Sequence, residues 1–250
     1  DKWSDYSAVE FKSYEEGGSL FENVMTLTKL SNKKALEHLD SKTDKESFLL
    51  PVQMVEACYG ASRNDITFPA AILQSPYYDK ARSKEANLGG IGVVIAHEVS
   101  HAFDTNGAQI DANGNVNNWW KDSDKNEFEK RAQKVKDFYN GITLDSGAKV
   151  NGDLTVSENI ADIEGMACIL DILGEMDNPN YKAFFEAWAT SWRMINTPEY
   201  EQMNLEQNVH SPHKVRVNAV VSQFQEFYDT YGIKEGDKMY VKPEDRISIY

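Results

Sequence analysis

Two histidines and a glutamate form the most informative pattern in this sequence, His97-Glu98-Val99-Ser100-His101. On a helix, positions i and i+4 lie on one face, about one turn apart. Two imidazoles at this spacing can bind one Zn²⁺ from the same side. Glu98 is rotated about 100° from His97 around the helix axis. Glu98 can therefore lie beside the metal without binding it, and accept a proton from a bound water.

The same pattern also fits a helix with two solvated histidines. By composition alone, roughly one or two chains in a hundred like this one would contain His-acid-x-x-His. The segment 91–96 is apolar apart from Gly92, which predicts a buried helix. Because buried polar side chains need partners, this setting favours a metal site over a solvated helix.

A third ligand is required, because a catalytic zinc site uses three protein ligands and leaves a fourth position open. The candidate is Glu158, on a second predicted helix; its alternative role is the N3 residue of a capping box with Thr155. With the histidine pair present, we favour the ligand and a His₂Glu site. Asp162 shares the face of Glu158 and is expected to orient a ligand histidine. Asp104 is a second candidate for that role, the alternative being a surface acid at a helix end.

These residues must be positioned by a mainly helical chain with a small sheet early on, an α+β fold. Apolar spacing and capping signals predict each element. No shift in composition marks a linker, so residues 1–250 are predicted to form one catalytic domain. The predicted helices run from Ser19 to about Asp40, from Asn87 to Phe103, from Ser123 to Asn140, from Thr155 to about Leu173, from Asn180 onward, and from Ser211-Pro212 to just before Gly232; the predicted strands are 51–58 and 64–68, around a turn at 60–62.

The bulk composition excludes several functions. The chain has 250 residues and a formal net charge of -14, which argues against binding nucleic acid or anionic membranes. It contains no apolar run of about 18 residues that could span a membrane. A chain of this length does not need a disulfide, so Cys58 and Cys168 are predicted to be two buried thiols, which favours a reducing compartment.

Beyond these residues, several motifs in the same order resemble the neprilysin-like zinc peptidases. The resemblance extends over nearly the whole chain, from about residue 1 to 250, and is more specific than one pentapeptide. It implies a thermolysin-like zincin fold, one Zn²⁺ per chain, and endopeptidase activity on short peptides. The matching motifs are 97–104 (HEVSHAFD), 158–162 (ENIAD), 63–74 (RNDITFPAAILQ), 118–120 (NWW), and 209–212 (VHSP) with Arg216.

The resemblance also implies roles for residues that the patterns alone do not single out. His210 would stabilise the oxyanion, although from the residues alone it is not preferred over His213. Arg216 would hold a substrate carbonyl. The segment 55–59, with Glu56 and Ala57, would be an edge strand that binds extended peptide. Asp162 would support catalysis. Ordinary core packing remains an alternative for the four residues that would line an apolar specificity pocket: Ile72, Tyr77, Val94 and Trp192.

The sequence departs from the family in three residues and in length. The edge strand usually has Asn where this chain has Glu56, which leaves the role of residue 56 open and allows a different preference downstream of the cleaved bond. Ser157 replaces a usual Gly, and Tyr250 a usual Trp. The family's N-terminal helical cap region is missing and is a predicted partner. We expect a cytoplasmic location, with an extracellular or membrane-anchored parent as the alternative. The rival functions are a zinc-binding module without catalysis and a purely structural helical domain.

Overall fold

The computed structural model describes residues 6–7, 9–42, 44–46 and 48–250, in two compact units, Asp1–Lys45 and Glu46–Tyr250. The first unit contains helix α1 (Leu20–Glu37). This helix begins after the predicted residue Ser19 with a capping box: the Ser19 hydroxyl accepts from the Glu22 amide at 3.2 Å, and the Glu22 carboxylate accepts from the Ser19 amide at 3.1 Å. The helix ends at Glu37 rather than near Asp40, and none of its side chains is buried.

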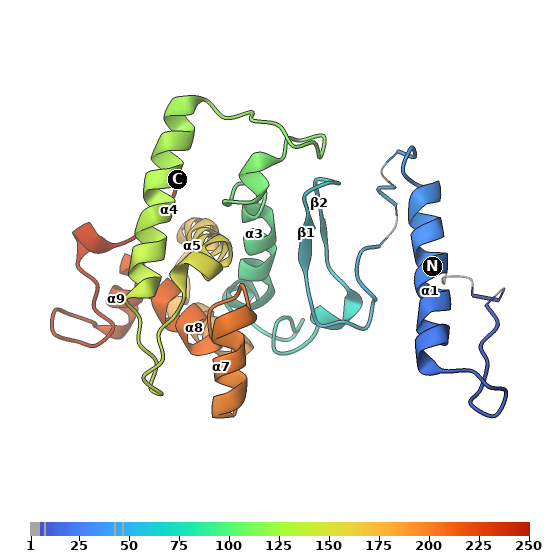
Figure 1. The fold of residues 1–250 in the computed structure, drawn as a ribbon. Coiled ribbons are helices and arrows are strands. Elements are labelled where there is room, and N and C mark those ends of the chain that lie inside the picture. Colours follow the sequence, from blue (N-terminus) through green and yellow to red (C-terminus); the bar gives the residue numbers. More distant parts are fainter. Residues whose placement is uncertain (1–5, 8, 43, 47) are drawn as a thin grey trace. The chain divides into compact units, whose positions relative to one another are not determined.

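The second unit is mainly helical and contains one small antiparallel sheet, so the predicted α+β class is confirmed. The sheet pairs β1 (Cys58–Gly60) with β2 (Asp65–Thr67). Figure 1 shows the helices of this unit in sequence colours. They are α2 (Lys84–Asn87), α3 (Val93–Ser100), α4 (Asp122–Asn140), α5 (Gly152–Gly174), α6 (Tyr181–Ser191), α7 (Pro198–Gln207), α8 (His213–Val221) and α9 (Gln225–Tyr231), with a π-helical turn Leu88–Gly92 and 3₁₀ turns Ala70–Ile72, Gly107–Gln109 and Pro243–Asp245.

Helix α5 is the centre of this unit. It packs against α3, α4 and α8, and Figure 1 shows it between α3 and α4. Most of its side chains are buried, including Ile160, Met166 and Leu173. Burying such side chains stabilises the fold by about 1.5–3 kcal/mol each. The polar residues of α5 are therefore held in a fixed frame.

Helix α5 begins earlier than predicted. Its N-cap is Asn151, whose side chain accepts from the Leu154 amide at 3.0 Å. Thr155 lies inside the helix, where its hydroxyl donates to the Asn151 carbonyl at 2.9 Å. The capping-box alternative for Glu158 is therefore wrong, because Thr155 is not the N-cap. The carboxylate of Glu158 is free to serve another purpose.

Other predicted boundaries also shift. The predicted strand 51–58 is wrong except at Cys58, where β1 begins. The single helix predicted from Asn87 is divided by the π-helical turn Leu88–Gly92. Lys121, not Ser123, is the N-cap of α4. The last predicted helix is two helices, with the predicted end at Gly232 confirmed.

The structure bears on the predicted burial of the two cysteines and on the search for membrane-spanning helices. The thiols are free, but they are not both buried: Cys58 is half-buried and Cys168 is exposed. The prediction of two buried thiols is wrong, since Cys58 opens onto a cleft and Cys168 lies on the outer face of α5. Among the described residues, no helix combines the length and apolar character needed to cross a membrane.

Candidate metal centre and active-site cleft

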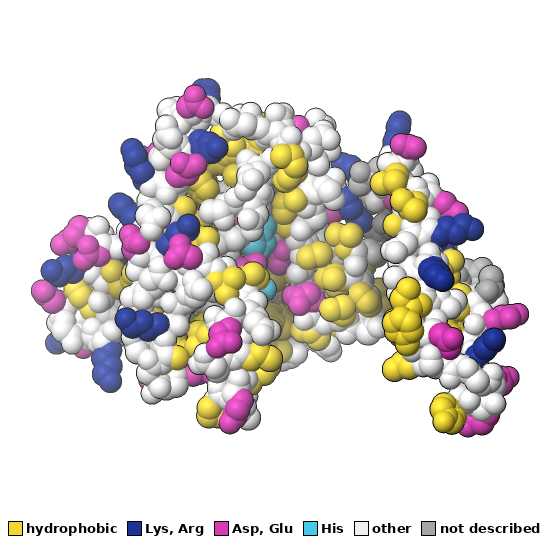
Figure 2. All heavy atoms as spheres, viewed as in Figure 1, with side chains coloured by type: hydrophobic (Ala, Val, Ile, Leu, Met, Phe, Trp, Pro, Cys, Tyr) yellow, Lys and Arg dark blue, Asp and Glu magenta, His cyan; other side chains and the backbone are white. Residues whose placement is uncertain are grey.

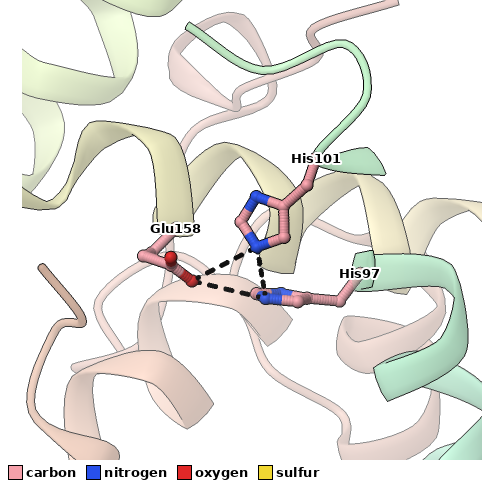
Figure 3. A group of neighbouring side chains, drawn as sticks. All are labelled: His97, His101 and Glu158. Atoms are coloured by element: carbon pink, nitrogen blue, oxygen red, sulfur yellow. Dashed lines mark hydrogen bonds and ion pairs between the residues drawn. The ribbon is translucent and has the colours of Figure 1, made fainter. Parts of the chain in front are cut away.

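The crossing of α3 and α5 brings together the three predicted ligands. Figure 3 shows the rings of His97 and His101 meeting the carboxylate of Glu158. Glu158 Oε2 lies 3.3 Å from His97 Nε2 and 3.6 Å from His101 Nε2. The two Nε2 atoms are 3.0 Å apart. These three residues also form a group whose ligand atoms all lie within 4.8 Å of one another.

A glycine permits this close crossing. A Cβ placed on Gly165 of α5 would lie 2.8 Å from the backbone nitrogen of His97 and 3.0 Å from its Cα. Real Cβ atoms are not tolerated so close to backbone, so any larger residue would push the helices apart. The distance between the histidines and Glu158 thus depends on a small residue two turns farther along α5.

Carboxylates hold the far nitrogens of both histidines. His97 Nδ1 lies 2.8 Å from Asp162 Oδ1, and His101 Nδ1 lies 2.6 Å from Asp104 Oδ2. Asp104 also accepts a hydrogen bond from the Ser157 hydroxyl and one at 2.7 Å from the Gly107 amide. Such carboxylates place the ring proton on Nδ1 and turn Nε2 toward a metal. The positions of Asp162 and Asp104 suit the orienting role predicted for them.

Asp162 is held in turn by a buried arginine. Arg216 of α8 donates two hydrogen bonds of 2.7 Å to the two carboxylate oxygens of Asp162. Both side chains are almost fully buried. Burial alone would raise the pKa of Asp162, but the charge of Arg216 and the hydrogen bond to His97 lower it to about 2. Asp162 is therefore ionised throughout the ordinary pH range.

The surroundings of the histidines favour positive charge. Burial lowers the pKa of His101, but hydrogen bonds to Asp104 and Glu158 outweigh burial and raise it to about 10. Burial would raise the pKa of Glu158, yet hydrogen bonds from His101, His210 and His97 lower it well below its usual range. Both directions have one cause: three carboxylates surround two imidazoles and attract positive charge, which protons on the rings or a metal cation can supply.

The donor set fits zinc. Zn²⁺ binds imidazole nitrogen and carboxylate oxygen, and catalytic sites commonly use three protein ligands. With the protons of His97 and His101 on Nδ1, both Nε2 atoms are lone-pair acceptors that face each other and a carboxylate. Glu158 Oε2 faces these two atoms at 3.3 and 3.6 Å, and neither can donate to it when its ring proton is on Nδ1. A divalent cation between these three atoms would satisfy all of them at once.

Glu98 lies next to this group without belonging to it. It is 5% exposed and opens onto the same cleft as the histidines. Burial raises the pKa of Glu98 above its ordinary value, while the charges of His97 and His101 act in the opposite direction. A raised pKa brings a carboxylate closer to the range in which it can accept and return a proton near neutral pH.

The cleft above the α3–α5 crossing has a volume of about 810 Å³. In Figure 2, histidine and acidic side chains gather in this hollow, with apolar side chains at its rim. All the residues that the sequence assigned to substrate binding lie along it. They are Glu56, Ala57, Ile72, Tyr77, Val94, Trp192 and Arg216.

Of these, the aromatic and aliphatic residues form part of the wall. Ile72 and Val94 are buried in a small apolar cluster with Ala57, against which Tyr77 packs. The Tyr77 carbonyl accepts from the Ile91 amide at 2.8 Å, which ties this wall to the turn before α3. The guanidinium carbon of Arg216 lies 4.0 Å from the centre of the Trp192 ring. Arg216 thus touches the cleft while one edge of its guanidinium, Nε and Nη2, is bonded to Asp162.

His210 and His213 are separated by their contacts. His210 Nε2 lies 3.1 Å from Glu158 Oε2, so this ring faces the predicted metal ligands. Its Nδ1 lies 3.0 Å from Asn208 Oδ1, which also accepts from the His210 backbone amide at 2.9 Å. His213 instead directs Nδ1 toward the Trp192 carbonyl at 3.2 Å. The geometry favours His210 over His213 for contact with a group bound at Glu158.

Sequence reasoning missed several residues of the cleft. Helix α7 was not predicted, although Thr197-Pro198 has the N-cap and N1 pattern, and Thr197 does accept from the Tyr200 amide at 3.2 Å. Ser157 was noted only as a departure, yet it bonds to Asp104. The buried Ser211 hydroxyl donates to Asn159 at 2.7 Å and joins the loop before α8 to α5. The residues of α7 and its flanks that line the cleft are Asn196, Tyr200, Glu201, Asn204 and Asn208.

Comparison with known proteins agrees with this geometry. The model of peptidase family M13 matches residues 56–247. The neutral endopeptidase of Lactococcus lactis is 43% identical over 233 residues, which is 93% of this chain and 37% of that protein. Mouse neprilysin is 31% identical over 245 residues, or 92% of this chain and 32% of that protein.

Solved structures give the same result. PepO from Lactobacillus rhamnosis superposes with a TM-score of 0.88 at 37% identity, over 100% of this chain and 39% of that one. The Mycobacterium tuberculosis zinc metalloprotease Zmp1, solved with an inhibitor, gives a TM-score of 0.88 at 32% identity, over 99% of this chain and 40% of that one. Fold and site thus define a metallopeptidase-type domain. The chain belongs to peptidase family M13, and it spans less than half the length of these relatives.

Proposed function

We propose that this chain carries the catalytic centre of a zinc metalloendopeptidase that hydrolyses peptide bonds in short peptides with an activated water. His97, His101 and Glu158 would hold one Zn²⁺ per chain. Zinc bound there would supply Lewis-acid chemistry, lowering the pKa of water toward about 7 and polarising the substrate carbonyl. The observation that carries the proposal is the convergence of these three ligand atoms within one cleft that also contains Glu98.

The chain's own residues would move the protons and stabilise charge. Glu98 would take a proton from water and return it to the leaving amine. His210, whose ring faces Glu158, would donate a hydrogen bond to the oxyanion, a contribution worth on the order of 3 kcal/mol. Asp162 and Asp104 would keep the two ligand rings in their orientations. The apolar wall beside Val94 would receive a side chain of the substrate.

Arg216 is the residue whose proposed role changes most with the geometry. Its Nε and Nη2 both bond Asp162 at 2.7 Å, so direct binding of a substrate carbonyl would use the other terminal nitrogen, Nη1, and remains a prediction. The contact that the structure describes is with Asp162, which in turn lies 2.8 Å from His97 Nδ1. Arg216 therefore fixes Asp162 and, through it, His97.

The test is to measure metal content and cleavage in the wild type and in Glu98→Gln. Wild-type protein should retain about one zinc per chain after dialysis, cleave a short unstructured peptide, and lose activity with a chelator. Glu98→Gln should keep its zinc and lose about 10²–10⁴-fold in kcat. The matched control is Glu129→Gln on the exposed face of α4, which should change neither value.

The three possible functions give different results in this experiment. Zinc without hydrolysis, in the wild-type protein at its full natural length, would identify a binding module that has lost catalysis. Absence of zinc would leave only a structural domain. Wild-type turnover in the Glu98→Gln variant would show that the base is another residue.

The length of the relatives leads to a proposal about the rest of the polypeptide. The chain spans 37% of the first Lactococcus relative. We propose that a further N-terminal region of the parent protein covers the cleft and restricts it to short peptides. A cytoplasmic location stays a prediction, supported by two free cysteines.

A further inference from the structure

We infer that the cleft selects peptides carrying a basic residue near the cleaved bond, and that Glu56 and Glu201 make this selection. The inference rests on the proposed function and adds the chemical class of substrate. It concerns two acidic side chains in the cleft that neither the metal group nor the proposed proton transfer uses. Both belong to wall segments rather than to the crossing of α3 and α5.

The lining of the cleft is strongly acidic. Among the described residues it has a single arginine and no lysine. That arginine, Arg216, is buried against Asp162 and its charge is balanced there. Even with a divalent metal bound, the carboxylates exceed the positive charges. The acidic residues of the lining are Glu56, Glu98, Asp104, Glu158, Asp162 and Glu201.

Four of these six carboxylates already have a partner or a proposed task. Asp104 and Asp162 face the ligand histidines, Glu158 is the third predicted ligand, and Glu98 is the predicted base. The remaining two, Glu56 and Glu201, have no ion pair with a described residue. A carboxylate left without a cation in a cleft favours a ligand that brings one.

Glu56 lines the cleft beside its apolar wall. It directly precedes Ala57, which packs in the apolar cluster with Ile72 and Val94. Among the described residues, its carboxylate accepts one hydrogen bond, a long one of 3.4 Å from the Ala57 amide. It lines the same cleft as Tyr77, whose pKa is raised by burial and, to a smaller extent, by the charge of Glu56. The field of this carboxylate therefore reaches the interior of the cleft, although the side chain is exposed.

Glu201 lies on a separate element, in the first turn of α7. It is half-buried beside Tyr200, whose ring also lines the cleft. An aromatic ring next to a carboxylate suits a lysine or arginine side chain, because the ring face attracts cations. The two glutamates thus offer a basic residue two distinct places, and the experiment can separate them.

The experiment uses the zinc-loaded protein at its full natural length and internally quenched peptides that differ at one position. Lys, Gln or Glu is placed in turn at each of the three positions on either side of the cleaved bond. At the substrate position that contacts Glu56 or Glu201, we expect kcat/KM to be highest for the Lys peptide, lower for the Gln peptide and lowest for the Glu peptide. Each step should be roughly 3- to 10-fold. The Lys preference should shrink in 0.5 M salt, since screening weakens exposed charges.

Three variants assign the effect. Glu56→Gln and Glu201→Gln should each reduce the ratio of kcat/KM for the Lys peptide to that for the Gln peptide at one substrate position. Glu56→Lys should reverse the order of the peptides, so that the Glu peptide is cleaved faster than the Lys peptide. Glu235→Gln removes the same charge from an exposed site outside the cleft and should leave the ratio unchanged. The ratio compares two peptides on one variant, so a general loss of activity does not affect it.

The outcomes distinguish this inference from the proposed function. Cleavage of Lys, Gln and Glu peptides at equal rates would overturn the inference while leaving the peptidase intact. An equal fall of the ratio in Glu235→Gln would attribute the preference to overall charge and also overturn it. Absence of any cleavage would instead overturn the proposed function.

Discussion

At the floor of the cleft the side chains of α3 and α5 contact one another closely, whereas on the wall formed by α7 every side chain is at least partly exposed. Both ring nitrogens of His97 and of His101 approach another polar atom at 2.6–3.3 Å. On the wall, Tyr200 is 40% exposed. None of the side chains of α7 is buried.

The two regions can therefore determine different properties of the protein. A ligand group must be held to within fractions of an ångström, and the buried carboxylates and Arg216 provide that restraint. A wall that selects among peptides needs only shape and charge, and exposed side chains can change without unfolding the protein. We therefore expect variants of the floor to affect stability and zinc, and variants of the wall to affect substrate affinity.

The largest effect is expected from Asp162→Asn. The variant leaves the Arg216 guanidinium buried without a counter-charge, and breaking a buried ion pair costs about 3–5 kcal/mol. The free energy of unfolding in urea should fall by an amount in this range. Asp153→Asn, on an exposed part of the same helix, is the control and should change stability by less than about 0.5 kcal/mol.

The same variant has a predictable dependence on pH. Because the folded pKa of Asp162 is lowered to about 2, its contribution to stability is complete above the unfolded pKa of about 3.9. The contribution is lost as pH falls through about 2. The stability difference between wild type and Asp162→Asn should therefore be constant from pH 5 to 8 and shrink below pH 4. A difference that grew on acidification would contradict the assignment.

A smaller and more specific effect is expected from Asp104→Asn. The amide keeps an acceptor for the Gly107 backbone but weakens the contact that fixes the His101 ring at 2.6 Å. Loss of such a carboxylate typically lowers metal affinity about 10- to 100-fold. Competition with a zinc chelator measures this. Asp111→Asn is the matched control, because Asp111 also accepts backbone amides in a turn but lies outside the cleft; equal zinc affinity in both variants would refute the role of Asp104.

The floor could be predicted from sequence better than the walls, for physical reasons. The spacing of His97 and His101 fixes their common face on any helix, and Glu158 with Asp162 repeats that spacing on α5. The approach of the two helices could not be predicted, because it depends on Gly165 meeting the His97 backbone. Local signals also failed at Thr155, where the Asn151 side chain and the fold around α5 decide the helix start.

The walls depend on contacts that no short pattern encodes. The segment 51–57 has strand-like composition, but only Cys58–Gly60 pairs with β2. Helix α7 carried a visible capping signal at Thr197-Pro198 and no apolar periodicity strong enough to reveal it. The position of α7 beside the cleft depends on tertiary packing, since the loop after α7 leads to His210 in the cleft lining.

The smallest effect on stability is expected from Tyr200→Ala. This variant tests most directly whether the α7 wall differs from the floor formed by α3 and α5. The side chain is 40% exposed and lines the cleft, so its removal should change the free energy of unfolding by less than about 0.5 kcal/mol. If the wall only helps to bind peptide, KM should rise about 2- to 5-fold with kcat and zinc content unchanged. Tyr14→Ala, which removes an 88% exposed ring outside the cleft, should leave KM as it is. A fall in kcat at constant KM would place Tyr200 with the residues that act in the transition state, and the division between a holding floor and a selecting wall would then fail.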